Sequence, residues 1–112
     1  MNTNQLESFL EVLNTINSRS PLAWVYLPSN GAWSLQSMSA TLESEEVPPE
    51  LEDEPNAGIP KFAKHNHLMQ VVPVETLQDI VSNALQQKAN ATAEELFAAF
   101  NFFYKNDAFI KI

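Results

Sequence analysis

Hydrophobic residues near the start of the chain recur at helical spacing. With about 100° between successive residues, these apolar side chains share one stripe roughly 120° wide: Leu6, Phe9, Leu10, Leu13 and Ile16. The pattern predicts an amphipathic helix over residues 6–16, capped by one of residues 2–4 and ended by residues 18–21. Glu7 would then lie in the first turn, where the helix dipole favours a carboxylate.

A different pattern follows, in which aromatic and β-branched residues form short runs. Residues 23–28 and 32–36 predict two strands, and the Asn-Gly pair at 30–31 predicts a type I′ turn, because both central positions of that turn need positive φ. The resulting hairpin would place Tyr26 opposite Leu35. One face of this hairpin would point its large side chains into the core: Trp24, Tyr26, Trp33 and Leu35.

In the second half of the chain, residues 68–72 predict a strand. Residues 74–88 predict a second helix, because their apolar positions recur at 3.6-residue spacing. Thr92 and Glu95 have the spacing of a capping box, so a third helix should begin there and end near residues 106–107.

Together these elements predict one α+β domain over residues 1–112. A chain of 112 residues is long enough for one hydrophobic core, and with no Cys that core must form without disulfides. We expect three amphipathic helices packed on a small, mostly antiparallel sheet, with residues 109–112 as a short terminal strand.

The acidic residues of the chain are concentrated in one segment, between residues 43 and 55, which we do not expect to form a helix or a strand. The chain has 14 Asp and Glu against 6 Lys and Arg, a net charge of −8. Half of the acids are crowded among prolines between residues 43 and 55: Glu43, Glu45, Glu46, Glu50, Glu52, Asp53 and Glu54. Such a segment buries too little apolar surface to offset the entropy of ordering, so we expect an exposed acidic loop over about residues 43–58. Two interpretations stay open: a solvated loop, or a surface that steers a basic partner.

The composition argues against most catalytic and nucleic-acid functions. A negative net charge repels phosphate backbones, two Gly cannot build a glycine-rich phosphate loop, and the chain contains no Cys and no Gly-x-Ser-x-Gly motif. His65 and His67 would lie on one side of an extended segment, but catalytic zinc normally needs three protein ligands. We therefore expect no enzymatic activity, no cofactor, no metal and no nucleic-acid partner. A small enzyme or regulator that uses His65 and His67 is the alternative.

The first residues also bear on where the protein acts. They lack the basic and apolar regions of a signal peptide, and no apolar run approaches the roughly 20 residues that cross a bilayer. We expect a cytoplasmic protein that does not bind membranes.

The core stripe of the third predicted helix leaves out one aromatic residue. The stripe itself contains Leu96, Phe97, Phe100, Phe103 and Tyr104. Phe102 lies about 200° around the helix from Phe100. Either the helix is packed on two sides, with residues 109–110 nearby, or Phe102 is an exposed anchor for a partner or a second copy.

In its small size, acidity, carboxylate-rich loop and lack of catalytic motifs, the chain resembles the immunity proteins of bacterial contact-dependent inhibition and related polymorphic toxin systems. The tail over residues 103–110 is also similar to the ending of a family of small bacterial proteins. The first resemblance implies a cytoplasmic protein that binds one cognate toxin domain, often a nuclease with a basic cleft, and blocks its active site or an adjacent surface. We therefore expect an inhibitor that contacts a basic toxin through the acids of residues 43–55 and through Phe102. The alternative within this class is a DNA-mimic or anti-restriction inhibitor.

Overall fold

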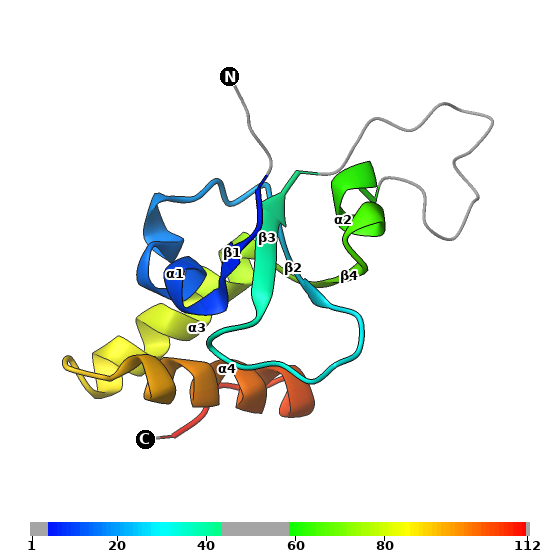
Figure 1. The fold of residues 1–112 in the computed structure, drawn as a ribbon. Helices are drawn as coiled ribbons and strands as arrows, with labels where there is room; N and C mark the ends of the chain where they lie inside the picture. Colours follow the sequence, from blue (N-terminus) through cyan, green and yellow to red (C-terminus); the bar gives the residue numbers. More distant parts are fainter. Residues whose placement is uncertain (1–4, 44–58, 112) are drawn as a thin grey trace.

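The computed structural model describes residues 5–43 and 59–111 and confirms the α+β class (Figure 1). The elements in chain order are β1 (Glu7–Ser8), α1 (Phe9–Asn14), the 3-10 turn η1 (Ile16–Ser18), β2 (Trp24–Pro28), β3 (Met38–Leu42), α2 (Lys61–His65), β4 (Leu68–Pro73), α3 (Val74–Gln87) and α4 (Ala93–Asn106). The four strands form one antiparallel sheet in the order β1-β3-β2-β4. None of the described helices is long and apolar enough to cross a membrane.

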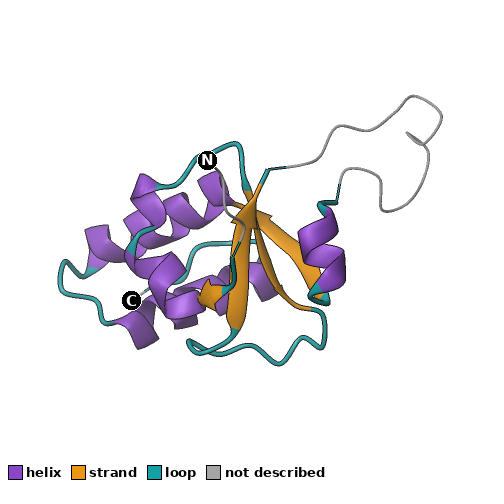
Figure 2. Ribbon diagram, turned by 45° about the horizontal axis from the view of Figure 1, so that its top comes forward, coloured by secondary structure: helices purple, strands orange, loops and turns teal. Residues whose placement is uncertain are grey.

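Helices cover both faces of this sheet. Figure 2 shows α2 on one side of the strands and the other helices on the opposite side. On the side of α1, α3 and α4, buried side chains from these helices and from the sheet form the main core: Phe9, Val12, Leu13, Ile16, Ala23, Val25, Leu27, Val72, Val74, Leu77, Ile80, Val81, Ala84, Leu96, Ala99 and Phe100. Under α2 lies a smaller second core: Tyr26, Ala40, Leu42, Ala63 and Leu68.

The central strand β2 serves both cores. Val25 and Leu27 enter the main core, whereas Tyr26 is buried in the second core and Trp24 packs against it. Because successive side chains of a strand point to opposite faces, a strand covered on both faces reads as a continuous apolar run rather than as an alternating one. This explains the pattern of residues 23–28, whose prediction as a strand is confirmed.

The predicted hairpin after β2 is wrong. β2 pairs with Met38–Leu42 rather than with residues 32–36, so that Tyr26 lies opposite Ala40 instead of Leu35. Asn30 has no positive φ, which rules out a type I′ turn; only Gly31 has one, at +75°. The Gly31 amide donates to the Pro28 carbonyl at 3.2 Å and closes a different tight turn.

Residues 31–37 form a loop because Trp33 finds its partners on α4. The Trp33 ring lies 5.9 Å from that of Phe100, and its Nε1 donates to the Pro28 carbonyl at 2.8 Å. Trp33 and Leu35 pack against the main core, so they do not share a face with Trp24 and Tyr26 as predicted.

The first helix is shorter than predicted. It begins at Phe9, where the Ser8 hydroxyl accepts from the Glu11 amide at 3.2 Å, so Ser8 is the cap; residues 2–4 lie outside the described residues. Glu7 belongs to β1 and pairs with Ser39 of β3 instead of starting the helix. Pairing with the sheet overrides a helical pattern that continues through this position.

The later elements follow the sequence closely. β4, α3 and α4 confirm the predicted strand and two helices, and Thr92 and Glu95 form the predicted capping box. The short helix α2 was not predicted. The predicted terminal strand is wrong, because residues 109–111 are not a strand and residue 112 lies outside the described residues. This tail instead folds back on α3, where Gln87 Nε2 donates to the Ile110 carbonyl at 2.8 Å.

Candidate functional site

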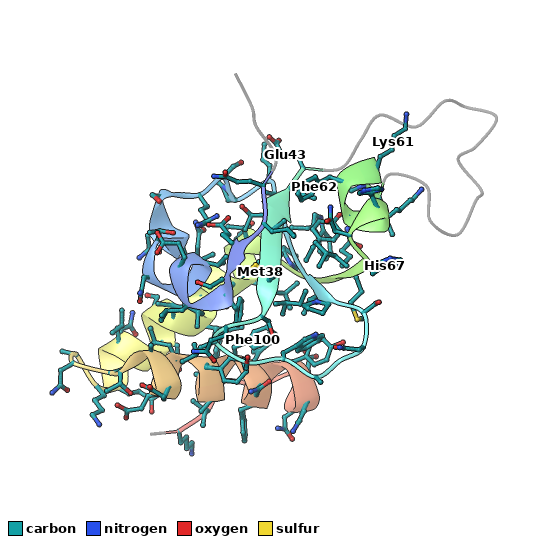
Figure 3. The ribbon with its side chains drawn as sticks, in the orientation of Figure 1. Met38, Glu43, Lys61, Phe62, His67 and Phe100 are labelled. Carbon is teal, nitrogen blue, oxygen red and sulfur yellow. The ribbon has the colours of Figure 1, made fainter. Side chains whose placement is uncertain are left out.

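The acidic side chains expected to contact a partner begin at the end of β3. Glu43 is exposed and lies at the end of the sheet near α2 (Figure 3). The other six lie outside the described residues: Glu45, Glu46, Glu50, Glu52, Asp53 and Glu54. The described residues carry eight Asp and Glu against six Lys and Arg. Six of the eight net negative charges therefore belong to residues 44–58.

Beyond this segment, helix α2 attaches the chain to the sheet again. The Pro60 carbonyl accepts from the amides of Ala63 and Lys64 at 3.1 and 3.2 Å, which forms the first turn. Ala63 is buried in the second core and Phe62 packs against it, whereas Lys61 and Lys64 are exposed. Figure 3 shows Lys61 pointing away from the sheet. Helix α2 therefore exposes Lys61 and Lys64 to solvent, while Phe62 and Ala63 attach it to the second core.

His65 and His67 do not form the extended pair that the sequence suggested. His65 is the last residue of α2, and His67 has a φ of +57°. The His67 amide donates to the Lys64 carbonyl at 3.3 Å and the His67 carbonyl accepts from the Ser29 amide at 3.0 Å, so this residue joins α2 to β4. Both imidazoles are exposed. Within residues 5–43 and 59–111, no three His, Cys, Asp or Glu side chains lie close enough together to hold a metal ion.

Phe102 lies on α4 with 37% of its surface exposed and belongs to neither core. The next residue, Phe103, packs against the main core and has its ring 5.4 Å from that of Phe109. The tail therefore covers α4 on the side of Phe103, which belongs to the predicted core stripe, and not on the side of Phe102. Phe102 itself keeps the exposure that the second alternative required of an anchor.

An aromatic cluster at the end of α4 was not predicted as a unit. The Trp33 ring meets that of Tyr104 edge to face at 5.0 Å, and the Phe100 and Tyr104 rings stack at 6.2 Å. Tyr104 is 44% exposed although it lies on the predicted core stripe. Periodicity identifies the stripe but not the point where the core beneath it ends. No local pattern connects Trp33 with residues so far along the chain.

A groove of about 480 Å³ lies between the end of α1, η1, α3 and α4. Its lining combines buried apolar side chains with a polar rim: Leu13, Asn14, Thr15, Ile16, Asn17, Ser18, Val81, Leu85 and Leu96. None of these side chains ionises near neutral pH, so the lining supplies no general acid or base. The groove could take an apolar side chain but offers no nucleophile–base pair.

The carboxyl group of Glu95 has a lowered pKa. Lys88 Nζ donates to Glu95 at 2.7 Å and the Thr92 amide donates to its other oxygen at 3.0 Å; these bonds lower the pKa of Glu95. Both favour the charged carboxylate. Both hydrogen bonds are made in the first turn of α4, where Glu95 belongs to the capping box. The lowered pKa is therefore explained by the ion pair with Lys88 and by helix capping.

Glu43 and helix α4, which carries Phe102, lie at opposite ends of β3. The loop that leads into β3 packs on α4 through Trp33, whereas Glu43 follows the far end of the strand (Figure 1). The structure therefore does not bring Glu43 and Phe102 together. A partner that touches both Glu43 and Phe102 must extend along the sheet.

Comparison with known protein families identifies a domain that spans nearly the whole chain. The profile of a domain of unknown function (DUF7716) matches residues 6–112. No curated protein and no solved structure matches the chain significantly.

Proposed function

The chain belongs to the DUF7716 family, and we propose that it is a cytoplasmic immunity or inhibitor protein without catalytic activity of its own. In this proposal it binds a cognate basic toxin domain, of which a nuclease is the most concrete case. It blocks the active site of that domain or a surface next to it.

The distribution of charge carries this proposal. Residues 44–58 contain six acids and no base, whereas the described residues are nearly balanced. General solubility does not require crowding, because dispersed charges serve it as well. A concentrated negative potential raises the rate at which a basic partner arrives, and its carboxylates can pair with Lys and Arg that otherwise hold phosphate groups.

Charge alone rarely supplies the desolvated centre of an interface, which is usually aromatic. Phe102 and Tyr104 are exposed on α4 and offer such a surface. Because α4 lies at the other end of β3 from Glu43, we assign two separate roles: the acidic segment steers the partner and α4 contributes to holding it.

The first test measures how the position of charge controls association. The partner is captured with the full chain from the native host, identified, and produced separately. One variant replaces Glu50, Glu52, Asp53 and Glu54 with Gln or Asn. A matched control removes the same number of exposed carboxylates from the described body: Glu11, Glu75, Asp79 and Glu94.

The segment variant should associate more slowly than the control. The difference should shrink at high salt, because exposed charges are screened over about 8 Å at physiological ionic strength. Equal association rates for the two variants would contradict steering by the segment. A partner that stays fully active, or fully toxic to cells, in a stoichiometric complex would contradict the inhibitor function.

A second test concerns Phe102. Phe102→Asp should weaken the complex by about 2 kcal/mol or more, roughly 30-fold in Kd, if this ring is a buried anchor of the interface. Ala98→Asp is the matched control, since Ala98 is exposed one turn earlier on α4. Equal affinities of the two variants for the partner would show that Phe102 is not an anchor of the interface.

A further inference from the structure

Strand β1 is a short attachment to the sheet. Only Glu7 and Ser8 form it, and β3 is its sole partner in the sheet. Beyond the paired main chains, the Ser39 hydroxyl donates to the Glu7 carbonyl at 2.9 Å. Glu7 is also held by Arg19, with both carboxylate oxygens at 2.7 Å from the guanidinium.

Arg19 has hydrogen-bond partners besides Glu7. Its Nε and Nη2 donate to the Thr15 hydroxyl at 3.1 and 2.8 Å, and its Nη1 donates to the Thr41 hydroxyl at 3.0 Å. The side chain is 17% exposed. These contacts hold the planar guanidinium beside β3 with one edge directed at a carboxylate, which is the geometry of bidentate carboxylate recognition.

The edge of β3 continues beyond β1. Glu7 lies opposite Ser39, and the Phe9 amide donates to the Ser37 carbonyl at 2.9 Å. Because main-chain groups alternate in direction along a strand, the N–H and C=O of Thr41 face the same side as those of Ser39. No residue of the described chain is paired with Thr41 on that side.

The other edge of the sheet is protected against strand addition. In β4 the register shifts opposite Val25 and Tyr26, so Val71 is an extra, bulged residue, and the strand ends at Pro73. Bulges and prolines are features by which proteins discourage pairing at an exposed edge. The described part of β3 from Ser39 to Thr41 has neither feature.

From these contacts we infer that the β3 edge between Ser39 and Thr41 is a strand-addition site, which β1 occupies in the isolated chain. The ligand is an extended segment of another protein that carries a carboxylate at the position of Glu7. Its main chain pairs with Ser39 and Thr41, and Arg19 selects it by binding that carboxylate. Strand addition of this kind takes affinity from main-chain hydrogen bonds and specificity from side-chain contacts.

The test uses the full chain with Glu7→Gln, in which β1 no longer supplies the carboxylate. The probe is an acetylated peptide with the sequence of residues 2–8, and the matched peptide has Gln in place of its Glu. The Glu peptide should bind about tenfold more tightly than the Gln peptide, as expected for one charge-assisted bidentate contact. Arg19→Lys, added to the same chain, should remove most of this preference.

Hydrogen exchange locates the peptide. The Thr41 amide should exchange more slowly when the Glu peptide is bound. The Ala40 amide, on the side of β3 that pairs with β2, should not change. Equal binding of the two peptides, or an unchanged Thr41 amide at saturating peptide, would overturn the inference. Self-association of the wild-type chain, which carries the Glu7 carboxylate, at the concentrations used would overturn the assignment of the ligand to another protein.

Discussion

Gly31→Val should destabilise the protein through the backbone alone. Gly31 has a φ of +75°, and a Cβ added there would meet nothing within 4 Å. A side chain therefore has room, but a β-branched residue is held in a backbone region that L-residues avoid. The cost of holding a β-branched residue there is about 1–3 kcal/mol.

Urea denaturation of the full chain measures this cost, and a comparison with Gly31→Asn isolates its cause. Asn also adds a Cβ but tolerates positive φ, so Gly31→Asn should lower the free energy of unfolding by less than about 1 kcal/mol. The slope of the transition should match the wild type in both variants. A wild-type stability for Gly31→Val would show that φ at this position is not positive. An equal loss for Asn and Val would show that steric contact, rather than φ, sets the cost.

Three further outcomes are expected. Replacing His65 with Gln and His67 with Asn should leave partner affinity unchanged within error, because neither side chain belongs to the proposed contact residues or to a metal-binding group among the described residues. Stoichiometric metal in the wild type together with lost function in the variant would favour the enzyme alternative. Asp107→Gly should raise the free energy of unfolding by about 0.5–1 kcal/mol, because it relieves a φ of +52° and removes a carboxylate from the C-terminal end of a helix; Asp107→Asn separates the two causes. Since hydrogen bonds from Lys88 and Thr92 lower the pKa of Glu95 in the folded state, its contribution to stability is present above the ordinary value of 4.5 and is lost as pH falls through the lowered pKa. The stability difference between wild type and Glu95→Gln, followed by thermal unfolding from pH 7 downward, should shrink over that range; a constant difference would contradict the shift.

The sequence predicted those elements whose structure is decided locally. α3 and α4 each combine a full apolar stripe with clear end signals, and the Thr92–Glu95 capping box is visible as spacing alone. β2 and β4 are apolar runs flanked by turn residues. In these segments propensity, periodicity and capping all favour the same structure, which is the condition under which local reasoning succeeds.

The errors lie where a distant contact decides between two local alternatives. The sequence predicts a strand over residues 32–36 and none over residues 38–42. Trp33 reverses this by packing on α4, so that Met38–Leu42 forms the strand that pairs with β2. Glu7 fits a helix stripe, but pairing with Ser39 places it in β1. No periodicity within one segment contains either contact.

The features of the candidate site likewise fall into those set by local sequence and those set by distant contacts. The exposure of Phe102 follows from its angle on α4, which is a local property. The exposure of Tyr104 does not, because it depends on where the main core ends. Arg19 gave no signal in the sequence, since its partners Glu7, Thr15 and Thr41 come from three separate segments.

The contact of Phe9 with Phe97 and Phe100 has a consequence for the nascent chain on the ribosome. The Phe9 ring lies 5.9 Å from that of Phe97 and 4.9 Å from that of Phe100, so it lacks these two aromatic partners until the residues of α4 have been made. At roughly 5–20 residues per second, translation of the intervening segment takes roughly 5–20 s. Throughout that interval the part of α1 that α4 covers, which includes the Phe9 ring, is open to chaperones and proteases. The main core therefore forms only after α4 has been synthesised, however fast the finished chain folds.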